Sequence, residues 1–492
     1  MSAIDWAIVA VYAAILVGIG VAASRKQNNT EEYFRGSQQL PWWAIGFSII
    51  ATSFSGAALL GGAGEGYNNG LLYLQLQVGD LIGYGLVIAL FLPFFVGLNL
   101  TTAYEYLERR FDSKTRVLGS ICFLLFVIAR LGGLLYAASL AVSTVVNIPL
   151  SAAILLVGIV SIVYTMAGGI AAVVWTDVLQ FVMVFVGLGA GVWAAAAGVN
   201  GGLGELWSTA AAAGKFAVVD TAWDPGNIRS LPTAVIAYGM LAFAVAGTNQ
   251  QSVQRYVSCA DVQSGRKAIL LGWFSGLIGV GATLVLGTLL FSFYSINPGL
   301  PEEIAGDAIL PFFIVNNVPA GAAGLLVAAI FAAAMSSIDS ALHALATCIT
   351  VDFYERFSRG PLNQARSLKV AQGLIALWGI VGIGAAFYAA STEENLLPFL
   401  IKYVTLSLGP LLGLFLMGVL VPRINANGAF YGTILAVLTL TYLTATERFG
   451  LPAFWGSAIT APLAVVFGIG ISLLGKVPAD RSIQGLTFWS KK

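Results

Sequence analysis

The chain has 492 residues, of which 58% are hydrophobic and only 10% are charged, and its mean hydropathy is +0.87. An ordinary soluble domain carries about 25% charged residues, so this composition argues against a soluble globular protein and predicts a protein embedded in a lipid bilayer. We expect no nucleic-acid partner, and the spacing of Cys122, Cys259 and Cys348 fits neither a disulfide framework nor a metal site.

Thirteen apolar segments predict membrane-spanning helices. A span needs about 20 mostly apolar residues, and such segments cover residues 5–24, 41–63, 71–98, 117–146, 150–169, 173–199, 231–250, 268–295, 307–350, 370–391, 396–420, 428–446 and 453–475. The segment 307–350 is long enough for a short outer helix followed by one span. We expect the first span to be retained rather than cleaved, because it lacks the basic start of a signal peptide and Asp5 is its only charge.

The basic residues predict the orientation of the chain. Lys and Arg prefer cytoplasmic loops, and most of them fall on one side when the thirteen spans are threaded in order. The residues on that side are Arg25, Lys26, Arg35, Arg109, Arg110, Lys114, Arg116, Arg255, Arg266, Lys267, those of the connection 356–369, Arg423, Lys476, Arg481, Lys491 and Lys492. The other side carries Lys215, Arg229 and Arg448. We therefore expect a multi-pass protein of the inner (plasma) membrane, with its N-terminus outside and its C-terminus in the cytoplasm.

Two spans contain residues that weaken a helix midway through the bilayer. The second span holds TSFSG at 52–56, and the seventh ends with GTNQQ at 247–251. Such runs can serve tight helix packing, or they can mark unwound backbone that lines a cavity. Because the two spans are five apart, they occupy matching places in two five-helix halves, which is typical of an inverted-repeat transporter.

Charged residues within spans are the next candidates for function, because they are costly at that depth. They are Asp80, Arg130, Asp177 and Asp339. Arg130 requires an anion, which is either Asp80 or the carboxylate of a solute, since a guanidinium binds carboxylates in a bidentate manner.

Asp339 lies three residues after Ser336, so the two share a helix face. Carboxylates and hydroxyls are ligands for small hard cations, and a hydrogen-bonded patch between helices is the alternative. His343 is the only histidine and keeps a proton-coupled mechanism open. The sequence contains no phosphate-binding loop, no histidine pair with metal spacing and no nucleophile with a paired base, so we predict no catalytic residue and no enzyme activity.

Longer runs of the sequence resemble the signatures of the sodium:solute symporter family. They are GGIAAVVWTDVLQ at 168–180 and AAMSSIDS at 333–340, which leads to TVDFY at 350–354, and EEYFRG at 31–36 is a weaker match. The resemblance covers nearly the whole chain. It implies an all-α membrane protein with a LeuT-type inverted five-helix repeat in spans two to eleven. On this basis residues 1–40 form the first span and a cytoplasmic loop, 41–420 the transport core, and 421–492 the last two spans and a cytoplasmic tail.

The resemblance also implies sodium as the coupling ion, with one or two ions per cycle. The first sodium site would use the backbone carbonyls of Ala51, Phe54 and Ala333 and the hydroxyls of Ser336 and Ser337. A second, deeper site would use Asp177, Ser336, Asp339 and Ser340. A serine is common in the family where this chain has Asp339, and the carboxylate would keep the second site anionic.

The pocket residues are most similar to those of the bacterial sialic-acid symporters within that family. The matching positions are Ser53, Ser55, Tyr73, Gln77 and Arg130, and Asn249 and Gln251 would flank the pocket. Ala58 and Asp80 depart from the pattern, so another carboxylate solute fits Arg130 equally well. The resemblance implies a sodium-coupled secondary active symporter that imports a small polar solute, sialic acid or a related acid, by alternating access and without an obligatory protein partner. The alternatives are a proton-coupled symporter, a sodium-coupled transporter of a neutral sugar or amino acid, and a membrane sensor that binds a solute without moving it.

Overall fold

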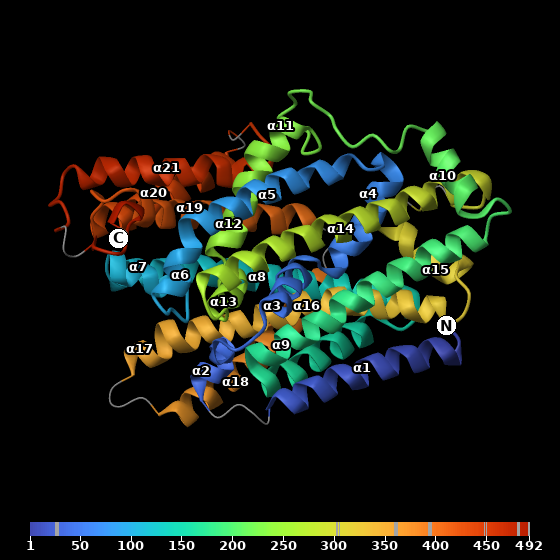
Figure 1. Ribbon diagram of the computed structural model, residues 1–492, viewed down its shortest axis with the longest axis horizontal. Helices are drawn as coiled ribbons and strands as arrows, with labels where there is room; N and C mark the ends of the chain where they lie inside the picture. The colour runs from blue at the N-terminus through green and yellow to red at the C-terminus, as the bar shows by residue number, and fades with distance from the viewer. Residues whose placement is uncertain are drawn as a thin grey trace.

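The computed structural model describes residues 1–24, 29–301, 304, 306–358, 363–391, 396–446, 448, 450–479 and 483–490. Within these ranges the chain is helical and has no β-strand, which confirms the all-α prediction. The long helices run side by side along the long axis of the molecule, with the N-terminus at one end and the C-terminus at the other (Figure 1).

The first six predicted spans all correspond to helices. They are α1 (Ala3–Ser24), the pair α3 (Trp42–Ser53) and α4 (Gly56–Asn69), the series η2 (Leu72–Gln75), α5 (Leu76–Leu86), η3 (Val87–Phe91) and α6 (Leu92–Gly97), then α8 (Ser113–Val146), and finally α9 (Leu150–Ala197), which contains two spans. The two spans of α9 meet at Gly169, whose φ of 55° and ψ of −161° are not helical. Glycine tolerates such a positive φ because it has no Cβ, so this residue lets the chain turn between adjacent spans.

The remaining seven spans also correspond to helices. They are α11 (Leu231–Thr233), η4 (Ala234–Tyr238), α12 (Gly239–Thr248) and α13 (Gln250–Val257) for the seventh, α14 (Val262–Ile296) for the eighth, and α16 (Ala322–Cys348), η6 (Ile349–Tyr354) and α17 (Glu355–Phe357) for the ninth. They continue with α18 (Gln364–Ser391), α19 (Leu396–Leu420), α20 (Ala426–Ala445), and η7 (Ala453–Trp455) with α21 (Gly456–Ser472). The predicted short outer helix before the ninth span is α15 (Ile309–Asn317), which η5 (Gly306–Ala308) precedes.

Length and hydropathy support this assignment among the described residues. Ten helices are long and apolar enough to cross a membrane, and the bent pair α3–α4 makes an eleventh. The two shorter apolar helices, Leu150–Met166 and Ser407–Leu420, coincide with the predicted fifth and eleventh spans.

Helix α16 is at the centre of the bundle, and nearly all of its residues are buried. It packs against α9, α8, α18, α1 and both halves of the broken second span. Helices α4 and α14 approach closely through glycine, because a Cβ on Gly66 would lie 2.2 Å from the carbonyl oxygen of Leu284. The second span is therefore held between α14 and α16.

The predicted basic loops gather at the C-terminal end of the bundle. This end holds α2 (Thr30–Arg35), α7 (Tyr104–Arg110) and α17, whereas α10 (Gly202–Ala212) and α15 lie at the other end (Figure 1). Of the predicted basic residues, Arg25, Lys26, Arg359, Arg481, Lys491 and Lys492 lie outside the described residues.

An ion-pair network closes the C-terminal end. Glu108 of α7 accepts hydrogen bonds from Arg116, at 2.8 Å, and from Arg356. Burial raises the pKa of the Glu108 carboxyl, but these hydrogen bonds outweigh burial and hold the pKa below its ordinary value of 4.5. Arg116 also donates to Asp352, at 2.6 Å, so α7, α8 and η6 are joined.

Candidate functional site

The second span is broken where the sequence predicts. Helix α3 ends at Ser53, α4 begins at Gly56, and their axes differ by 69°. The Ser55 hydroxyl accepts a hydrogen bond from the Ala58 backbone N–H at 3.2 Å and so caps the new helix. Ser53, Ala57 and Ala58 are exposed although they lie midway along a span. The break is therefore left uncovered by neighbouring helices on the side of these residues.

The seventh span is broken at the matching place. Helix α12 ends at Thr248, and Asn249 is extended, with φ −76° and ψ 123°. The Asn249 side chain accepts a hydrogen bond from the Gln251 N–H at 3.0 Å and starts α13. Both predicted breaks are therefore present, and each is made by a polar side chain that caps the second half-helix.

The residues predicted for the first sodium site lie together. The Ser336 hydroxyl donates to the Ala51 carbonyl at 2.8 Å and to the Ala333 carbonyl at 3.0 Å. The Ser337 hydroxyl donates to the Thr52 carbonyl at 3.0 Å. A small pocket beside these groups is lined by Ala51, Phe54, Ala333 and Ser336, with Gln180, Phe181 and other largely apolar residues around them. Hydroxyl and carbonyl oxygens from the break of α3 and from α16 thus lie close together, and such oxygen ligands suit a small hard cation.

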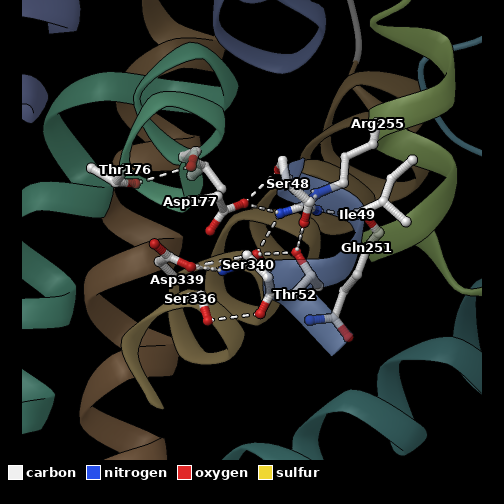
Figure 2. Close-up of polar contacts among 12 residues, drawn as sticks. Ser48, Ile49, Thr52, Thr176, Asp177, Gln251, Arg255, Ser336, Asp339 and Ser340 are labelled. Carbon is white, nitrogen blue, oxygen red and sulfur yellow. Dashed lines mark hydrogen bonds and ion pairs between the residues drawn. The ribbon is translucent and has the colours of Figure 1, made fainter. Parts of the chain in front are cut away.

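The residues predicted for the second sodium site also lie together, one turn along α16 (Figure 2). Asp177 of α9 and Asp339 of α16 are fully buried. Asp339 accepts hydrogen bonds from the Tyr164 hydroxyl at 2.7 Å and from the Ser340 N–H at 2.6 Å. The Ser340 hydroxyl is 3.1 Å from that of Thr52. This cluster therefore shares α3 and α16 with the first set of residues.

Arg255 of α13 lies within the second cluster, which corrects its assignment to a basic loop. It is 1% exposed and its guanidinium donates to the Asp177 carboxylate at 2.8 Å and to the Ser340 hydroxyl at 2.6 Å. It also donates to the Ser48 hydroxyl at 2.7 Å and to the Gln251 carbonyl at 2.7 Å (Figure 2). The loop assignment was wrong because the apolar run ends at the break, whereas the helix resumes after it as the polar α13.

The cluster has an unbalanced charge. Arg255 compensates Asp177, but Asp339 has no cationic side chain within 4.0 Å among the described residues. Two carboxylates and one guanidinium give the cluster a net charge of −1 when both carboxylates are ionised. The described residues contain no group of three or more His, Cys, Asp or Glu side chains that could hold a metal ion. Hydroxyls and a single uncompensated carboxylate suit a monovalent cation rather than a transition metal.

The sequence analysis did not assign four further residues to the site. Ser48 donates to Asp177, Thr52 lies one turn later on α3, and Tyr164 donates to Asp339. When the Gln180 side-chain amide is oriented so that its oxygen and its nitrogen both have hydrogen-bond partners, the nitrogen donates to Asp177 at 3.1 Å. Thr52 belongs to the run at 52–56 that predicts the break, and Ser48 lies one turn before it on α3. A search of the helix face that leads to the break could have found both.

The predicted pocket residues fall into two groups. Ser53 and Ser55 lie at the break of the second span, and Tyr73 and Gln77 lie on η2 and α5 beside it. Gln77 is near Ile50 of α3, since both would contact a Cβ on Gly276. Asn249 and Gln251 are almost fully buried and bond to each other, with 3.3 Å between the Asn249 amide nitrogen and the Gln251 side-chain oxygen.

Arg130 does not pair with Asp80, which answers one alternative left by the sequence. No carboxylate among the described residues lies within 4.0 Å of Arg130. Its one polar or ring contact there is the Phe126 ring, whose centre is 5.9 Å from the guanidinium carbon. Asp80 instead accepts hydrogen bonds from Gln77 at 3.0 Å and from Tyr238 at 3.5 Å. Arg130, midway along α8, therefore has no ion-pair partner within the part of the chain that the structure describes.

His343 is buried on α16, with its Nε2 atom 3.2 Å from the Tyr33 carbonyl oxygen. It lies one turn beyond the Asp339 cluster and contacts the Tyr33 and Phe34 rings. His343 is therefore packed at the interface of α2 and α16.

Comparisons with known proteins identify what the chain is similar to. The model of the sodium:solute symporter family matches residues 33–436. The chain is 32% identical to the sodium/sialic acid symporter NanT of Aliivibrio fischeri, over 93% of this chain and 90% of that protein. It is also 32% identical to the sodium/sialic acid symporter SiaT of Proteus mirabilis, over 89% of this chain and 88% of that protein.

A solved structure has the same fold. It is the substrate-bound, outward-open state of a sodium-coupled sialic acid symporter, with a TM-score of 0.88 and 30% identity, covering 97% of this chain and 99% of that one. This likeness confirms the LeuT-type architecture that the family resemblance implied.

Proposed function

Because the chain belongs to the sodium:solute symporter family, we propose that it couples sodium influx to the import of a small carboxylate-bearing solute. The observation that carries the choice of solute is the unpaired guanidinium of Arg130. The relatives named above transport sialic acid with sodium, so sialic acid and related sugar acids are the first solutes to test.

The solute would bind in the space beside the break of the second span. Ser53 is exposed there, and Gln77 approaches the same helix. Arg130 would bind the solute carboxylate, because an arginine inside a membrane bundle requires a compensating anion and this one has none among the described residues. Ser55 and Tyr73 would complete the pocket, and Asn249 and Gln251 would shape its wall from the seventh span.

The first sodium ion would bind between α3 and α16. Ala51, Phe54 and Ala333 would supply carbonyl oxygens, and Ser336 and Ser337 would supply hydroxyl oxygens. The hydroxyls donate to the carbonyls of Ala51 and Thr52, so oxygens of α3 and α16 lie close to one another, which supports a site shared by the two helices. Sodium would then join the broken helix to the centre of the bundle, which links ion binding to the shape of the pocket.

A second sodium ion would bind at Asp339, with Ser336, Ser340 and Asp177 beside it. Energetics favour two ions when the solute is an anion. One positive charge crossing 100 mV contributes about 2.3 kcal/mol, and a tenfold sodium gradient contributes about 1.4 kcal/mol. With one sodium, an anionic solute cancels the charge and only about 1.4 kcal/mol remains. With two, the sum is about 5.1 kcal/mol.

Transport would proceed by alternating access around these sites. Residues 41–420 would form the moving core, with residues 1–40 and 421–492 outside it. The C-terminal end of the bundle would face the cytoplasm, because the basic loops gather there, and the N-terminus would be outside. We propose that the chain acts in the lipid bilayer without an obligatory protein partner and without enzyme activity.

Uptake of labelled sialic acid into proteoliposomes tests the proposal. We expect uptake to require an inward sodium gradient and to be lost in Arg130→Ala. A matched control is Arg448→Ala, because Arg448 lies just after the end of α20 and its guanidinium contacts Tyr442 alone among the described residues. Uptake that an acid-inside or acid-outside pH gradient drives without sodium would favour the proton-coupled alternative. A neutral sugar driven by sodium, with Arg130→Ala unaffected, would contradict the carboxylate assignment.

A further inference from the structure

We infer that Asp80 is a second specificity residue of the pocket and that the solute carries an ammonium group as well as a carboxylate. The inference rests on the proposed function, in which Arg130 binds the solute carboxylate. It adds a binding partner, Asp80, for a second charged group of the same solute. Among the described residues, Arg130 and Asp80 are charges of opposite sign that have no ion-pair partner and do not pair with each other.

Asp80 is a carboxylate without a cation. It lies on α5, within the third span, and no Lys, Arg or His side chain of the described residues is within 4.0 Å of it. Its two protein partners are neutral donors, the Gln77 amide at 3.0 Å and the Tyr238 hydroxyl at 3.5 Å. An ionised carboxylate in a membrane bundle is costly without a positive partner, and the described residues do not supply one.

The surroundings of Asp80 connect it to the proposed pocket. Gln77, its hydrogen-bond donor, is one of the predicted pocket residues and lies one turn earlier on the same helix face. Gln77 also lies near Ile50 of α3, in the helix that ends at the break of the second span. Asp80 is itself only partly buried. Asp80 is thus linked through Gln77 to the helix that ends at the break.

The local backbone supports a recognition role. Tyr238 ends the π-helical segment η4, and a second π-helical segment, η3, follows α5 directly. Such segments occur frequently at functional sites because the extra residue redirects side chains. Helix α5 and η4 also approach closely, since a Cβ on Gly79 would lie 2.3 Å from the Ala234 carbonyl oxygen. Tyr238 and Asp80 are thus held against each other by rigid backbone.

Charge balance favours an ammonium group on the solute as the partner of an ionised Asp80. A simple carboxylate solute on Arg130 would leave Asp80 as one uncompensated negative charge in the pocket. A solute with one carboxylate and one ammonium group would compensate both side chains and would itself be neutral. Each sodium ion would then move a full charge across the membrane, because a zwitterion carries no charge back. A hydroxyl could donate to Asp80, but it would leave the charge uncompensated.

Matched pairs of solutes test the inference on the wild-type protein. The probes are alanine and lactate, glucosaminate and gluconate, and 4-aminobutyrate and 4-hydroxybutyrate, each pair differing by an ammonium group in place of a hydroxyl. Binding is measured as the solute-dependent rise in melting temperature of the purified full chain in sodium. We expect at least one amino compound to bind about tenfold more tightly than its hydroxyl partner.

Variants assign the preference to Asp80. We expect Asp80→Asn to reduce the amino preference to within about twofold while binding of the hydroxyl partner persists. The control is Glu205→Gln, which removes an exposed carboxylate on α10 and should leave the preference unchanged. The melting temperature in sodium without solute shows whether Asp80→Asn folds, and the wild-type comparison stands without the variant.

The outcomes separate the two proposals. If carboxylates bind but every hydroxyl compound binds as well as its amino partner, or if Asp80→Asn keeps the preference, the inference is wrong and the proposed function stands. If no carboxylate binds in the presence of sodium, or if binding survives Arg130→Gln, the proposed function itself fails.

Discussion

Replacing Arg255 by methionine should destabilise the protein more than any change at a surface ion pair. The side chain is 1% exposed and joins α13 to α3, α9 and α16 through Ser48, Asp177 and Ser340. Removing one partner of a buried ion pair costs about 3–5 kcal/mol, because the other charge is left buried and unpaired. Asp177 would keep its hydrogen bonds from Ser48 and Gln180. We therefore expect the free energy of unfolding to fall by about 3 kcal/mol.

The double variant distinguishes the lost ion pair from lost packing. In Arg255→Met with Asp177→Asn, the carboxylate that Arg255 compensated is also removed and only Asp339 stays uncompensated, as in the wild type. Most of the loss should therefore be recovered, and the coupling energy should be about 2 kcal/mol. Unfolding of the purified protein in mixed detergent micelles, followed by tryptophan fluorescence, measures both values. The control is Arg229→Met. Its pair with Glu65 is partly exposed, with side chains 34% and 17% accessible, so we expect about 1 kcal/mol or less.

Two results would refute this reasoning. The first is a loss for Arg255→Met no larger than that for Arg229→Met. The second is additivity of the Arg255 and Asp177 substitutions, because additive changes mean that the two residues do not stabilise each other. Either result would remove Arg255 from the ion cluster and return it to the loop assignment made from the sequence.

Three further predictions concern the sodium site, helix packing and pH. Ser336→Ala should raise the sodium concentration for half-maximal uptake about tenfold, whereas Thr433→Ala, whose hydroxyl bonds within α20, should leave it unchanged. Gly66→Ala should lower the free energy of unfolding by about 1–3 kcal/mol, because the added Cβ would clash with the α14 backbone; Gly85→Ala, with nothing within 4 Å, should cause no loss. Hydrogen bonds from arginine outweigh burial and lower the pKa of Glu108 in the folded protein. The ionised Glu108 carboxylate therefore stabilises the folded protein above about pH 4.5, and this contribution is lost as the pH falls through the folded pKa. Glu108→Gln should therefore lower the melting temperature at about pH 7 more than at about pH 3.5, and equal effects at both would contradict the assignment.

Local patterns predicted the helices and the broken second span well. Apolar runs of sufficient length must form helices in a bilayer, since no water is available to bond the backbone. The run at 52–56 breaks its helix because Ser55 offers the next turn an N-terminal cap. These are short-range effects, and a single sequence contains them.

The parts that the sequence missed depend on tertiary contacts. Helix α13 is polar because its side chains bond to other helices, so its hydropathy resembles that of a loop and Arg255 was misplaced. The separation of Arg130 from Asp80 depends on how α5 and α8 are rotated about their axes, which apolar composition does not fix. The proximity of Asp177 and Asp339, more than 150 residues apart in the chain, was predicted from family resemblance rather than from spacing.

Solute-stimulated influx of radioactive sodium tests the central claim most directly. Proteoliposomes holding the wild type or Arg130→Gln would be supplied with sialic acid, other sugar acids, amino acids or neutral sugars, and the initial rate of ²²Na⁺ influx would be measured. The account predicts that at least one carboxylate-bearing solute accelerates sodium influx in the wild type and that none does so in Arg130→Gln. Acceleration by a neutral sugar alone, or an undiminished response in Arg130→Gln, would contradict it.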